Sequence, residues 1–483
     1  MFAQLKQSAA TAGEKALVSS GHSLFVLPAD KPAQFPYAAV LEAKLKRSRA
    51  KYAELGKSPV CADLPGGGVA AWVVLDGRMG AFERHTALRK ALKTLLDEKP
   101  QSLAIAVYGD DETRRRAARD ALYVAWLNAA ELPTRKGKHK SHPLKTIALH
   151  GWNEADGFAE ARATAQGNTL ARTLTMLPPN DLTPAIYRDK VRALAAEHGW
   201  QHEEYDLKKL RKLGAGAFVA VAQGSLTEDA AIVHLTYIPK KAKKNIALVG
   251  KGICFDTGGH NLKPARYMHG MHEDMNGSAV ALGILLAATQ ARLPVKIDCW
   301  LAIAQNHISP SAYKQNDVVT ALNGTTIEII HTDAEGRMVL ADTLTLASRG
   351  KPDLMIDFAT LTGSMATALG DRYSGILGNT PELLCKAVGI GNAAGERVCA
   401  FPFDADYEDD LDSKIADIKQ CTLDGDADHI LAARFLAKFI EGDAPWLHVD
   451  LSSSNRKGGL GAVASDVNGF GVALGMRLVA DFL

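Results

Sequence analysis

The sequence predicts an α/β protein made of two domains, and three observations carry that prediction. The chain has 483 residues, which exceeds the usual size of one hydrophobic core. Short apolar segments alternate with amphipathic helical segments, as in βαβ units on a mostly parallel sheet. Residues 246–249 read Ile-Ala-Leu-Val before a glycine, the pattern of a buried central strand. We expect a smaller N-terminal domain and a larger C-terminal domain, whose mostly parallel central sheet is flanked by helices.

The N-terminal third alternates strands and helices but carries no catalytic signature. It contains no carboxylate pair, no clustered histidines and no glycine-rich phosphate loop. The expected strands cover 23–27, 69–75, 103–108 and 146–149, and the expected helices cover 38–55, 82–96 and 112–132.

A polar helical segment over 156–176 separates the two halves of the chain. It ends at Pro178-Pro179, and two consecutive prolines stop a helix. We therefore expect an N-terminal α/β domain over 1–153, a connecting helix over 154–180 and the second domain over 181–483.

The second half continues the alternation with longer elements. Asp274 is expected to open a helix, and Asn323-Gly324 marks a tight hairpin turn. The expected strands cover 230–237, 246–249, 295–304, 318–322, 326–330, 354–359 and 446–451, and the expected helices cover 186–197, 277–290, 338–348 and 430–440.

Composition and charge exclude several protein classes. The hydrophobic fraction of 47% is that of a globular chain, and the net charge of +2 gives no global attraction to nucleic acid or membranes. Six scattered cysteines without C-x-x-C spacing favour reduced thiols in a cytosol. Residues 1–15 lack a signal-peptide core, and the longest apolar run, 279–288, is too short to span a membrane. We expect a soluble, cytoplasmic protein.

One basic stretch departs from this balance. It comprises three arginines on an expected helix and the loop that follows, namely Arg114, Arg115, Arg116, Arg135, Lys136, Lys138, His139 and Lys140. No aromatic residues interleave with it as a nucleic-acid platform needs, so a solvated helix face and a surface loop are the favoured interpretation. DNA contact stays open as the minor alternative.

The most informative segment is 331–337, which reads His-Thr-Asp-Ala-Glu-Gly-Arg. An extended backbone would point Asp333, Glu335 and Arg337 to one side. Two crowded carboxylates repel each other unless a cation lies between them. The heptapeptide therefore predicts a cation site with a guanidinium beside it.

A second polar segment precedes it in the chain. Residues 250–259 read Gly-Lys-Gly-Ile-Cys-Phe-Asp-Thr-Gly-Gly and follow the expected central strand, so Lys251 and Asp256 should lie at its carboxyl end. A phosphate-binding loop is excluded, because Lys251 precedes the glycine loop instead of closing it. The acids of both segments would together neutralise two divalent metal ions: Asp256, Asp274, Asp333 and Glu335.

These donors suit a hydrolytic metal site. Carboxylate oxygens suit Mg²⁺ or Mn²⁺ and are accepted by Zn²⁺, and paired ions activate water and polarise a carbonyl. Lys251 ligates only as a neutral amine, which requires a pKa lowered by burial and by the neighbouring dication. Lys263 would stabilise an oxyanion, and Arg337 would hold an anion. A mixed site is the alternative, with four rival histidine ligands: His260, His269, His272 and His331.

Over most of residues 165–483 the sequence resembles the leucyl aminopeptidase (cytosol aminopeptidase) family of dinuclear metallopeptidases. The matching motifs are Val-Gly-Lys-Gly at 249–252, Phe-Asp-Thr-Gly-Gly at 255–259, Lys263, Met271 with Asp274, Thr-Asp-Ala-Glu-Gly-Arg at 332–337, Pro-Pro-Asn at 178–180 and Ala-Thr-Leu-Thr-Gly at 359–363. The resemblance implies catalysis in the C-terminal domain, a homohexamer, and removal of the first residue from peptides with a free N-terminus.

The resemblance also implies a role for each site residue. One metal would be held by Lys251, Asp256, Asp274 and Glu335, and the other by Asp256, Asp333 and Glu335. The ions would be Zn²⁺ or Mn²⁺, with Mg²⁺ as a further option. Lys263 would polarise the scissile carbonyl, and Arg337 would hold a bicarbonate acting as general base. The substrate would contact Met271, Thr360, Gly363, Ser452 and Asn455.

The chain departs from the family pattern beside the site. His331 stands where the family usually has Asn, Asn276 replaces a glycine, and the triplet 260–262 is less apolar. The pocket wall at 451–455 reads Leu-Ser-Ser-Ser-Asn, and such a polar wall reorders substrates by about 1–3 kcal/mol per altered group. The stretch 458–475 is also rearranged.

Two other functions stay open. One is a DNA-binding or regulatory protein on the same fold, which the balanced charge disfavours. The other is a catalytically silent hexamer, which the intact set of clustered charges disfavours.

Overall fold

The structure, a computed structural model, describes residues 2–138 and 140–483 and divides the chain into two compact units. Unit 1 comprises the chain up to Thr169 together with Asn392–Glu396 and Arg456–Asn468. Unit 2 comprises Leu170–Gly391, Arg397–Asn455 and Gly469–Leu483. The units thus differ from the expected limits at 153 and 181, and two short segments of the C-terminal half belong to unit 1. His139 of the basic stretch lies outside the described residues.

Unit 1 contains a six-stranded sheet in the order β1-β6-β5-β2-β4-β3, parallel except for the β3–β4 pair. Helices α1 and α2 and the short helix η1 pack on one face, and α3 and α4 pack on the other. The strands are β1 (Gln4–Ser8), β2 (His22–Pro28), β3 (Val60–Asp63), β4 (Val69–Leu75), β5 (Ser102–Val107) and β6 (Thr146–His150), and the helices are α1 (Glu14–Ser20), α2 (Ala38–Ser48), η1 (Tyr52–Gly56), α3 (Ala81–Leu96) and α4 (Asp111–Ala129).

Two local features of unit 1 differ from expectation. The expected helix 38–55 is two helices, because Arg49 adopts a left-handed backbone with φ of 54° and ends α2. Strand β1 was not expected, since it is a half-exposed edge strand whose polar sequence lacks an apolar pattern.

Helix α5 (Ala159–Thr175) occupies the expected connecting segment, and the division between the units falls inside it. Unit 2 then forms an eight-stranded sheet in the order β15-β14-β17-β13-β9-β10-β8-β7. Its four central strands, β17, β13, β9 and β10, are mutually parallel. The strands are β7 (Gln201–Asp206), β8 (Ala231–Tyr237), β9 (Asn245–Asp256), β10 (Lys296–Asn306), β13 (Leu354–Ala359), β14 (Ser374–Gly378), β15 (Val398–Ala400) and β17 (Trp446–Asp450).

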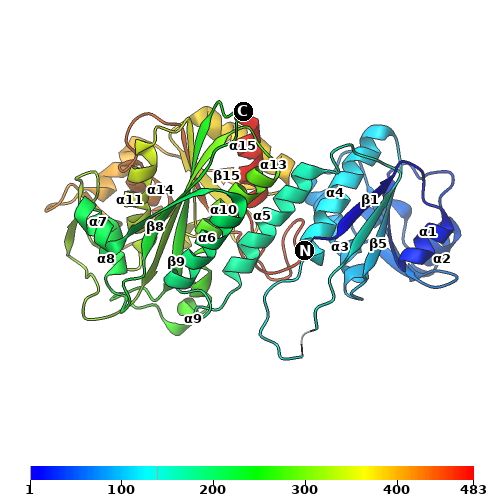
Figure 1. Ribbon diagram of the computed structural model, residues 1–483, viewed down its shortest axis with the longest axis horizontal. Coiled ribbons are helices and arrows are strands. Elements are labelled where there is room, and N and C mark those ends of the chain that lie inside the picture. Colours follow the sequence, from blue (N-terminus) through cyan, green and yellow to red (C-terminus); the bar gives the residue numbers. More distant parts are fainter. Residues whose placement is uncertain (1, 139) are drawn as a thin grey trace. The chain divides into compact units, whose positions relative to one another are not determined.

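Helices cover both faces of this sheet. Helices α6, α10 and α15 pack on one face and α8, α11 and α14 on the other (Figure 1). The helices are α6 (Pro184–His198), α7 (Leu207–Leu213), α8 (Gly216–Ala222), α9 (Ala265–Met268), η2 (Met271–Glu273), α10 (Asn276–Gln290), α11 (Glu335–Arg349), α12 (Gly363–Leu369), α13 (Pro381–Ala394), η3 (Ala405–Leu411), α14 (Asp428–Ala437) and α15 (Val472–Asp481).

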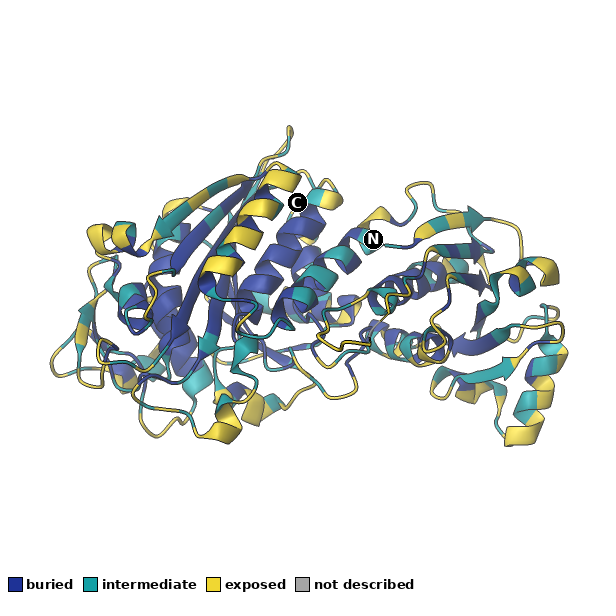
Figure 2. Ribbon diagram, turned by 60° about the horizontal axis from the view of Figure 1, so that its bottom comes forward, coloured by how far each residue is buried: buried dark blue, intermediate teal, exposed yellow. Residues whose placement is uncertain are grey.

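The sheet interior explains the sequence pattern. Strands β9 and β10 are buried along almost their whole lengths, as Figure 2 shows, so both read as continuous apolar runs. The predicted fold class, two α/β domains with a mostly parallel central sheet in the larger, is confirmed. Within the described residues, no helix combines the length and apolarity that a bilayer crossing requires.

The central strand is longer than expected. The sequence placed its end near 249, but β9 continues to Asp256 because residues 250–253 pair with β10. Gly250 is required inside the strand, since a Cβ there would lie 2.4 Å from the Cα of Ser278 on α10. Lys251 therefore lies within the strand, and Asp256 is its last residue.

The Asn323-Gly324 turn joins an antiparallel hairpin, as expected. Its strands β11 (Val318–Thr320) and β12 (Thr326–Glu328) are joined by the parallel strand β16 (Ile418–Lys419) in a small separate sheet.

Candidate metal centre

Four carboxylates and two lysines meet near the carboxyl end of β9. Lys251 and Asp256 come from β9, and Asp274 directly follows η2. Glu335 is the first residue of α11, and Asp333 lies in the turn before it. Acid oxygens of Asp256, Asp333 and Glu335 lie within 4.8 Å of one another. Asp274 is outside this trio, and Lys251 links it to Glu335 by contacting both carboxylates.

The geometry of the 331–337 segment differs from the expected one. Because α11 begins at Glu335, the segment is a turn followed by a helix instead of an extended strand. Residues two apart in a helix point about 200° apart, so Arg337 does not face the same way as Glu335. The expectation that three alternating side chains share one side is wrong for Arg337.

Lys251 is held between two acids. Its Nζ lies 2.8 Å from Asp274 Oδ2 and 2.9 Å from Glu335 Oε1, and it donates to the Thr360 carbonyl at 3.0 Å. Gly336 makes room for it, since a Cβ there would lie 2.6 Å from Lys251 Cε.

Lys251 was expected to be a neutral amine, but the surrounding charges favour its protonated form. Burial alone would lower its pKa, but the charges of Asp274, Glu335 and Asp256 outweigh burial and raise the pKa. The expected lowered pKa is therefore not a property of the protein chain by itself. A dication would have to displace the ammonium proton.

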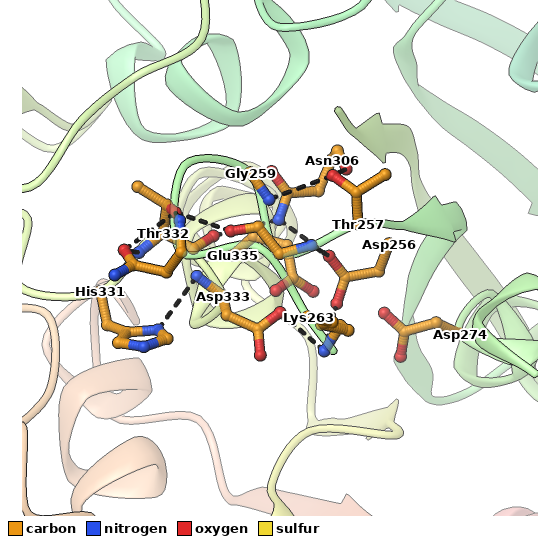
Figure 3. A network of polar contacts seen from close by, with 12 residues as sticks. Asp256, Thr257, Gly259, Lys263, Asp274, Asn306, His331, Thr332, Asp333 and Glu335 are labelled. Carbon is orange, nitrogen blue, oxygen red and sulfur yellow. Dashed lines mark hydrogen bonds and ion pairs between the residues drawn. The ribbon is translucent and has the colours of Figure 1, made fainter. Parts of the chain in front are cut away.

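Lys263 bridges the other two acids. Its Nζ lies 3.0 Å from Asp256 Oδ2 and 2.6 Å from Asp333 Oδ1 (Figure 3). The loop after β9 fixes its backbone, because its N–H donates to the Thr257 carbonyl at 2.9 Å. Burial opposes the charge, yet the neighbouring carboxylates raise the Lys263 pKa.

The acids outnumber the bases, and their pKa values reflect this. Burial first, and repulsion between the carboxylates second, raise the pKa of Asp333 to about 7 and of Glu335 to about 8. Burial likewise raises the pKa of Asp274 to about 6, although Lys251 opposes the shift. Four carboxylates against two ammonium groups leave a deficit of positive charge.

The donor set fits divalent metal ions. Asp274 Oδ2, Asp333 Oδ1 and Glu335 Oε1 are buried, accept no hydrogen bond of good geometry and lie only against lysine ammonium groups. Hard carboxylate oxygens that lack other partners are the ligands that Mg²⁺, Mn²⁺ and Zn²⁺ take in proteins. A dication would relieve the repulsion that raises the acid pKa values.

Polar residues outside the predicted set hold the acids in place. Asp256 Oδ1 accepts from the Gly258 N–H and from Asn306 Nδ2, both at 2.8 Å. The Thr332 carbonyl accepts from Asn306 and from the Tyr313 hydroxyl. Sequence reasoning missed Asn306, although it ends β10 opposite Asp256 and the strand-end argument applied to β9 would have found it.

Two of the rival histidines make hydrogen bonds to the backbone. His260 Nδ1 lies 2.9 Å from the Tyr313 carbonyl, and His331 Nδ1 accepts from the Asp333 N–H at 3.2 Å. In the part of the chain that the structure describes, the group with metal-binding spacing contains carboxylates alone. The mixed-ligand alternative gains no support.

The five predicted substrate contacts occupy different settings. Thr360 adjoins the centre, since its hydroxyl donates to Asp274 Oδ1 at 2.6 Å, and Met271 begins η2 just before Asp274. Gly363 is the first residue of α12, and a Cβ added there would have no atom within 4 Å.

The two polar wall residues already have partners. The Ser452 hydroxyl donates to the Tyr373 carbonyl at 2.8 Å. Asn455 Nδ2 donates to both Glu273 oxygens, at 2.9 and 2.8 Å, so the wall also carries a carboxylate.

A cavity of about 350 Å³ lies beside Lys263 and Asp333. Its lining residues are Asn261, Leu262, Lys263, Pro264, Tyr267, His331 and Asp333. None of the five predicted substrate contacts lines it. Leu262 and Tyr267 are large exposed apolar side chains, a feature that appears only once the loop is folded.

Arg337 binds an internal acid. Its Nη2 donates to both Asp428 oxygens, at 2.7 and 2.9 Å, and its Nη1 donates to the Gln420 carbonyl at 3.0 Å. The side chain is only 2% exposed. A bicarbonate does not fit here, because a carboxylate of the chain already takes the guanidinium.

The chain is similar to several known proteins. The model of the cytosol aminopeptidase family, catalytic domain, matches residues 169–476. A probable cytosol aminopeptidase of Stutzerimonas stutzeri is 45% identical over 298 residues, and one of Pseudomonas fluorescens is 44% identical over 324 residues. These alignments cover 61% and 66% of this chain and 59% and 65% of the relatives, less than two thirds of their length.

A solved structure is similar over nearly the whole chain. The bottromycin maturation enzyme BotP, in complex with Mn, is 30% identical with a TM-score of 0.83, covering 96% of this chain and 99% of BotP. Because the family model spans well over half of the residues and includes every acid of the centre, this chain belongs to the cytosol aminopeptidase family.

Proposed function

We propose that the protein is a metal-dependent aminopeptidase that removes the N-terminal residue from peptides with a free N-terminus. The observation that carries the proposal is the excess of buried carboxylates over lysines beside an open cavity. The family and the Mn named in the BotP complex support it. Catalysis would belong to the second domain, expected over 181–483.

The centre would hold two divalent ions, Zn²⁺ or Mn²⁺ or else Mg²⁺. Lys251, Asp256, Asp274 and Glu335 would hold one, and Asp256, Asp333 and Glu335 the other. Ions bound there would supply an activated water and a polarised carbonyl.

Lys263 would bind the substrate. Its ammonium lies at the cavity wall, 3.0 Å from Asp256 Oδ2 and 2.6 Å from Asp333 Oδ1. Once cations neutralise Asp256 and Asp333, the ammonium is free to donate to the carbonyl oxygen as negative charge develops there. Thr360 would hold Asp274 in place through its hydroxyl.

The DNA-binding alternative is the less favoured one. Three helical arginines that suggested it are paired with acids: Arg114 with Asp111, Arg115 with Glu154 and Arg116 with Glu112. Each pairing offsets part of the positive charge of the helix, although exposed ion pairs are weak. A homohexamer and a cytoplasmic location remain proposals from the resemblance.

The test is hydrolysis of X-Gly dipeptides and aminoacyl-anilides by protein stripped of metal and then given Mn²⁺ or Zn²⁺. We expect metal-restored release of the first residue, absent in Asp333→Asn and retained in Asp443→Asn, which changes an exposed loop acid. Folded protein that releases nothing with either metal would overturn the proposal.

A further inference from the structure

The Arg337 guanidinium is closed off by the chain itself. Nη1 and Nη2 are used by Gln420 and by both oxygens of Asp428, and the buried Nε has no exposed surface to offer an external ligand. The contact with Asp428 is a charge-assisted one in which a single nitrogen, Nη2, faces both carboxylate oxygens. The remaining N–H groups belong to a side chain that is 2% exposed, so an anion from solvent reaches them only if Asp428 moves aside.

Local structure holds Asp428 in this position. It is the first residue of α14, after Ala427 in a left-handed turn with φ of 52°, and a carboxylate there is favoured by the helix dipole. The next residue, His429, donates its N–H to the Ser364 hydroxyl at 2.9 Å, and its ring Nδ1 lies 3.0 Å from the same oxygen. The ion pair thus joins the first turns of α11 and α14, and the His429–Ser364 contacts join α14 to α12.

An external anion competes poorly with such a partner. Asp428 is tethered beside Arg337 and loses no translational freedom on pairing, whereas a free anion loses it on every binding event. Asp428 is also 21% exposed, so its burial costs less than that of Arg337.

We propose that Asp428 is a built-in carboxylate that takes the place of bicarbonate on Arg337, so that peptide hydrolysis by this chain needs no added anion. Asp428 is then a positioning residue, which fixes Arg337 next to the metal-binding turn. This inference rests on the proposed aminopeptidase function.

The binding test does not depend on activity. Bicarbonate is titrated calorimetrically into Zn²⁺-loaded protein, and crystals are soaked in bicarbonate to locate any bound ion. We expect no ion on Arg337 in the unmodified protein, and a roughly tenfold or larger gain in affinity in Asp428→Ala, the effect of at least one recovered charge-assisted hydrogen bond.

Matched variants identify the site. Asp426→Ala removes an exposed acid two residues away and should behave like the unmodified protein. Arg337→Met combined with Asp428→Ala should lose the new site. Bicarbonate on Arg337 in the unmodified protein, with Asp428 displaced, overturns the proposal, as does a folded Asp428→Ala that gains nothing. If Asp428→Ala does not fold, the same bicarbonate titration and crystal soak are carried out with Asp428→Asn and compared with the unmodified protein.

Activity supplies the second readout. In buffer freed of carbon dioxide, peptide release by the unmodified protein should be insensitive to added bicarbonate, whereas Asp428→Ala should be activated by it. A protein that releases nothing under any condition refutes the aminopeptidase function, while the soaked crystals still decide whether Asp428 closes the site.

Discussion

Each of the two units buries a carboxylate among basic side chains, and the two clusters have opposite charge balance. In unit 1, Asp120 on α4 lies 2.7 Å from Arg84 Nε and 2.9 Å from Arg119 Nη2, with His85 nearby. Burial would raise its pKa, but His85, Arg119 and Arg84 hold the pKa far below its usual range. In unit 2, four carboxylates share two lysines, and three of the acids have raised pKa values.

The difference shows that charge balance, more than burial, distinguishes a structural cluster from a ligand site. Asp120 has more cations than it needs and requires nothing from outside. The acids of unit 2 lack cations, so they either hold protons or take metal ions. Four experiments test whether the two clusters differ in this way.

The largest effect is expected on activity. Glu335→Gln removes a carboxylate of the trio, and metal-restored peptide release should fall by at least about 10²–10³-fold, the loss typical of one group that stabilises developing charge. Bound metal per chain, measured by elemental analysis, should fall too. Glu382→Gln, an exposed change on α13, should leave both unchanged, and a Glu335→Gln protein with full metal content would contradict the assignment.

Stability should respond oppositely in the two clusters. Asp120→Asn leaves buried cations without their partner and should cost about 3–5 kcal/mol. Asp333→Asn relieves repulsion, so the metal-free protein should be no less stable than before. Denaturant midpoints of the two variants decide, and loss of stability in both would show that the unit 2 cluster is an ordinary ion-pair network.

Metal should stabilise the folded protein through unit 2 alone. A ligand at one hundred times its Kd adds about 2.7 kcal/mol, which appears as a rise in Tm. Zn²⁺ or Mn²⁺ should raise the Tm of the unmodified protein and have little effect on Asp333→Asn. An equal rise in both would place the metal elsewhere.

The smallest effect is a pH dependence with opposite signs. In unit 2, acids with ordinary pKa values of 3.8 and 4.5 rise to about 6, 7 and 8 on folding, so the folded state binds more protons. Their stabilising contribution is complete below about pH 4 and is lost as the pH rises toward about 8, by at most about 1.4 kcal/mol per pH unit for each proton.

Asp120 has the reverse dependence. Its pKa is lowered on folding, so its contribution is present above its ordinary value of 3.8 and lost as the pH falls below it. Between about pH 5 and 9 the Asp120 contribution is constant, and the raised pKa values of the unit 2 acids dominate. Denaturant midpoints of metal-free protein should therefore fall as the pH rises through this range, and Asp333→Asn should flatten the curve. A flat curve for the unmodified protein would contradict the raised acid pKa values.

Local sequence patterns were sufficient for the elements and for the chemistry of the centre. Apolar runs and apolar periodicity located β2, β4, β5, β10 and β13 and helices α10 and α11, because these elements are buried in or against a core. The acids and lysines of the centre lie in two short motifs, so their types could be read directly. The end of β9 was misplaced, because glycines that normally end a strand here admit α10.

The fold class and the residues that supply acid and base could be read from the amino-acid sequence. Their partners became visible in the folded protein. Arg337 meets Asp428 across 91 residues of chain, Lys251 joins acids from two further segments, and the cavity forms from a loop and the 331–333 turn. Periodicity reports which face of an element is buried, whereas the pairing of one polar atom with another depends on how distant segments pack, which no local pattern encodes.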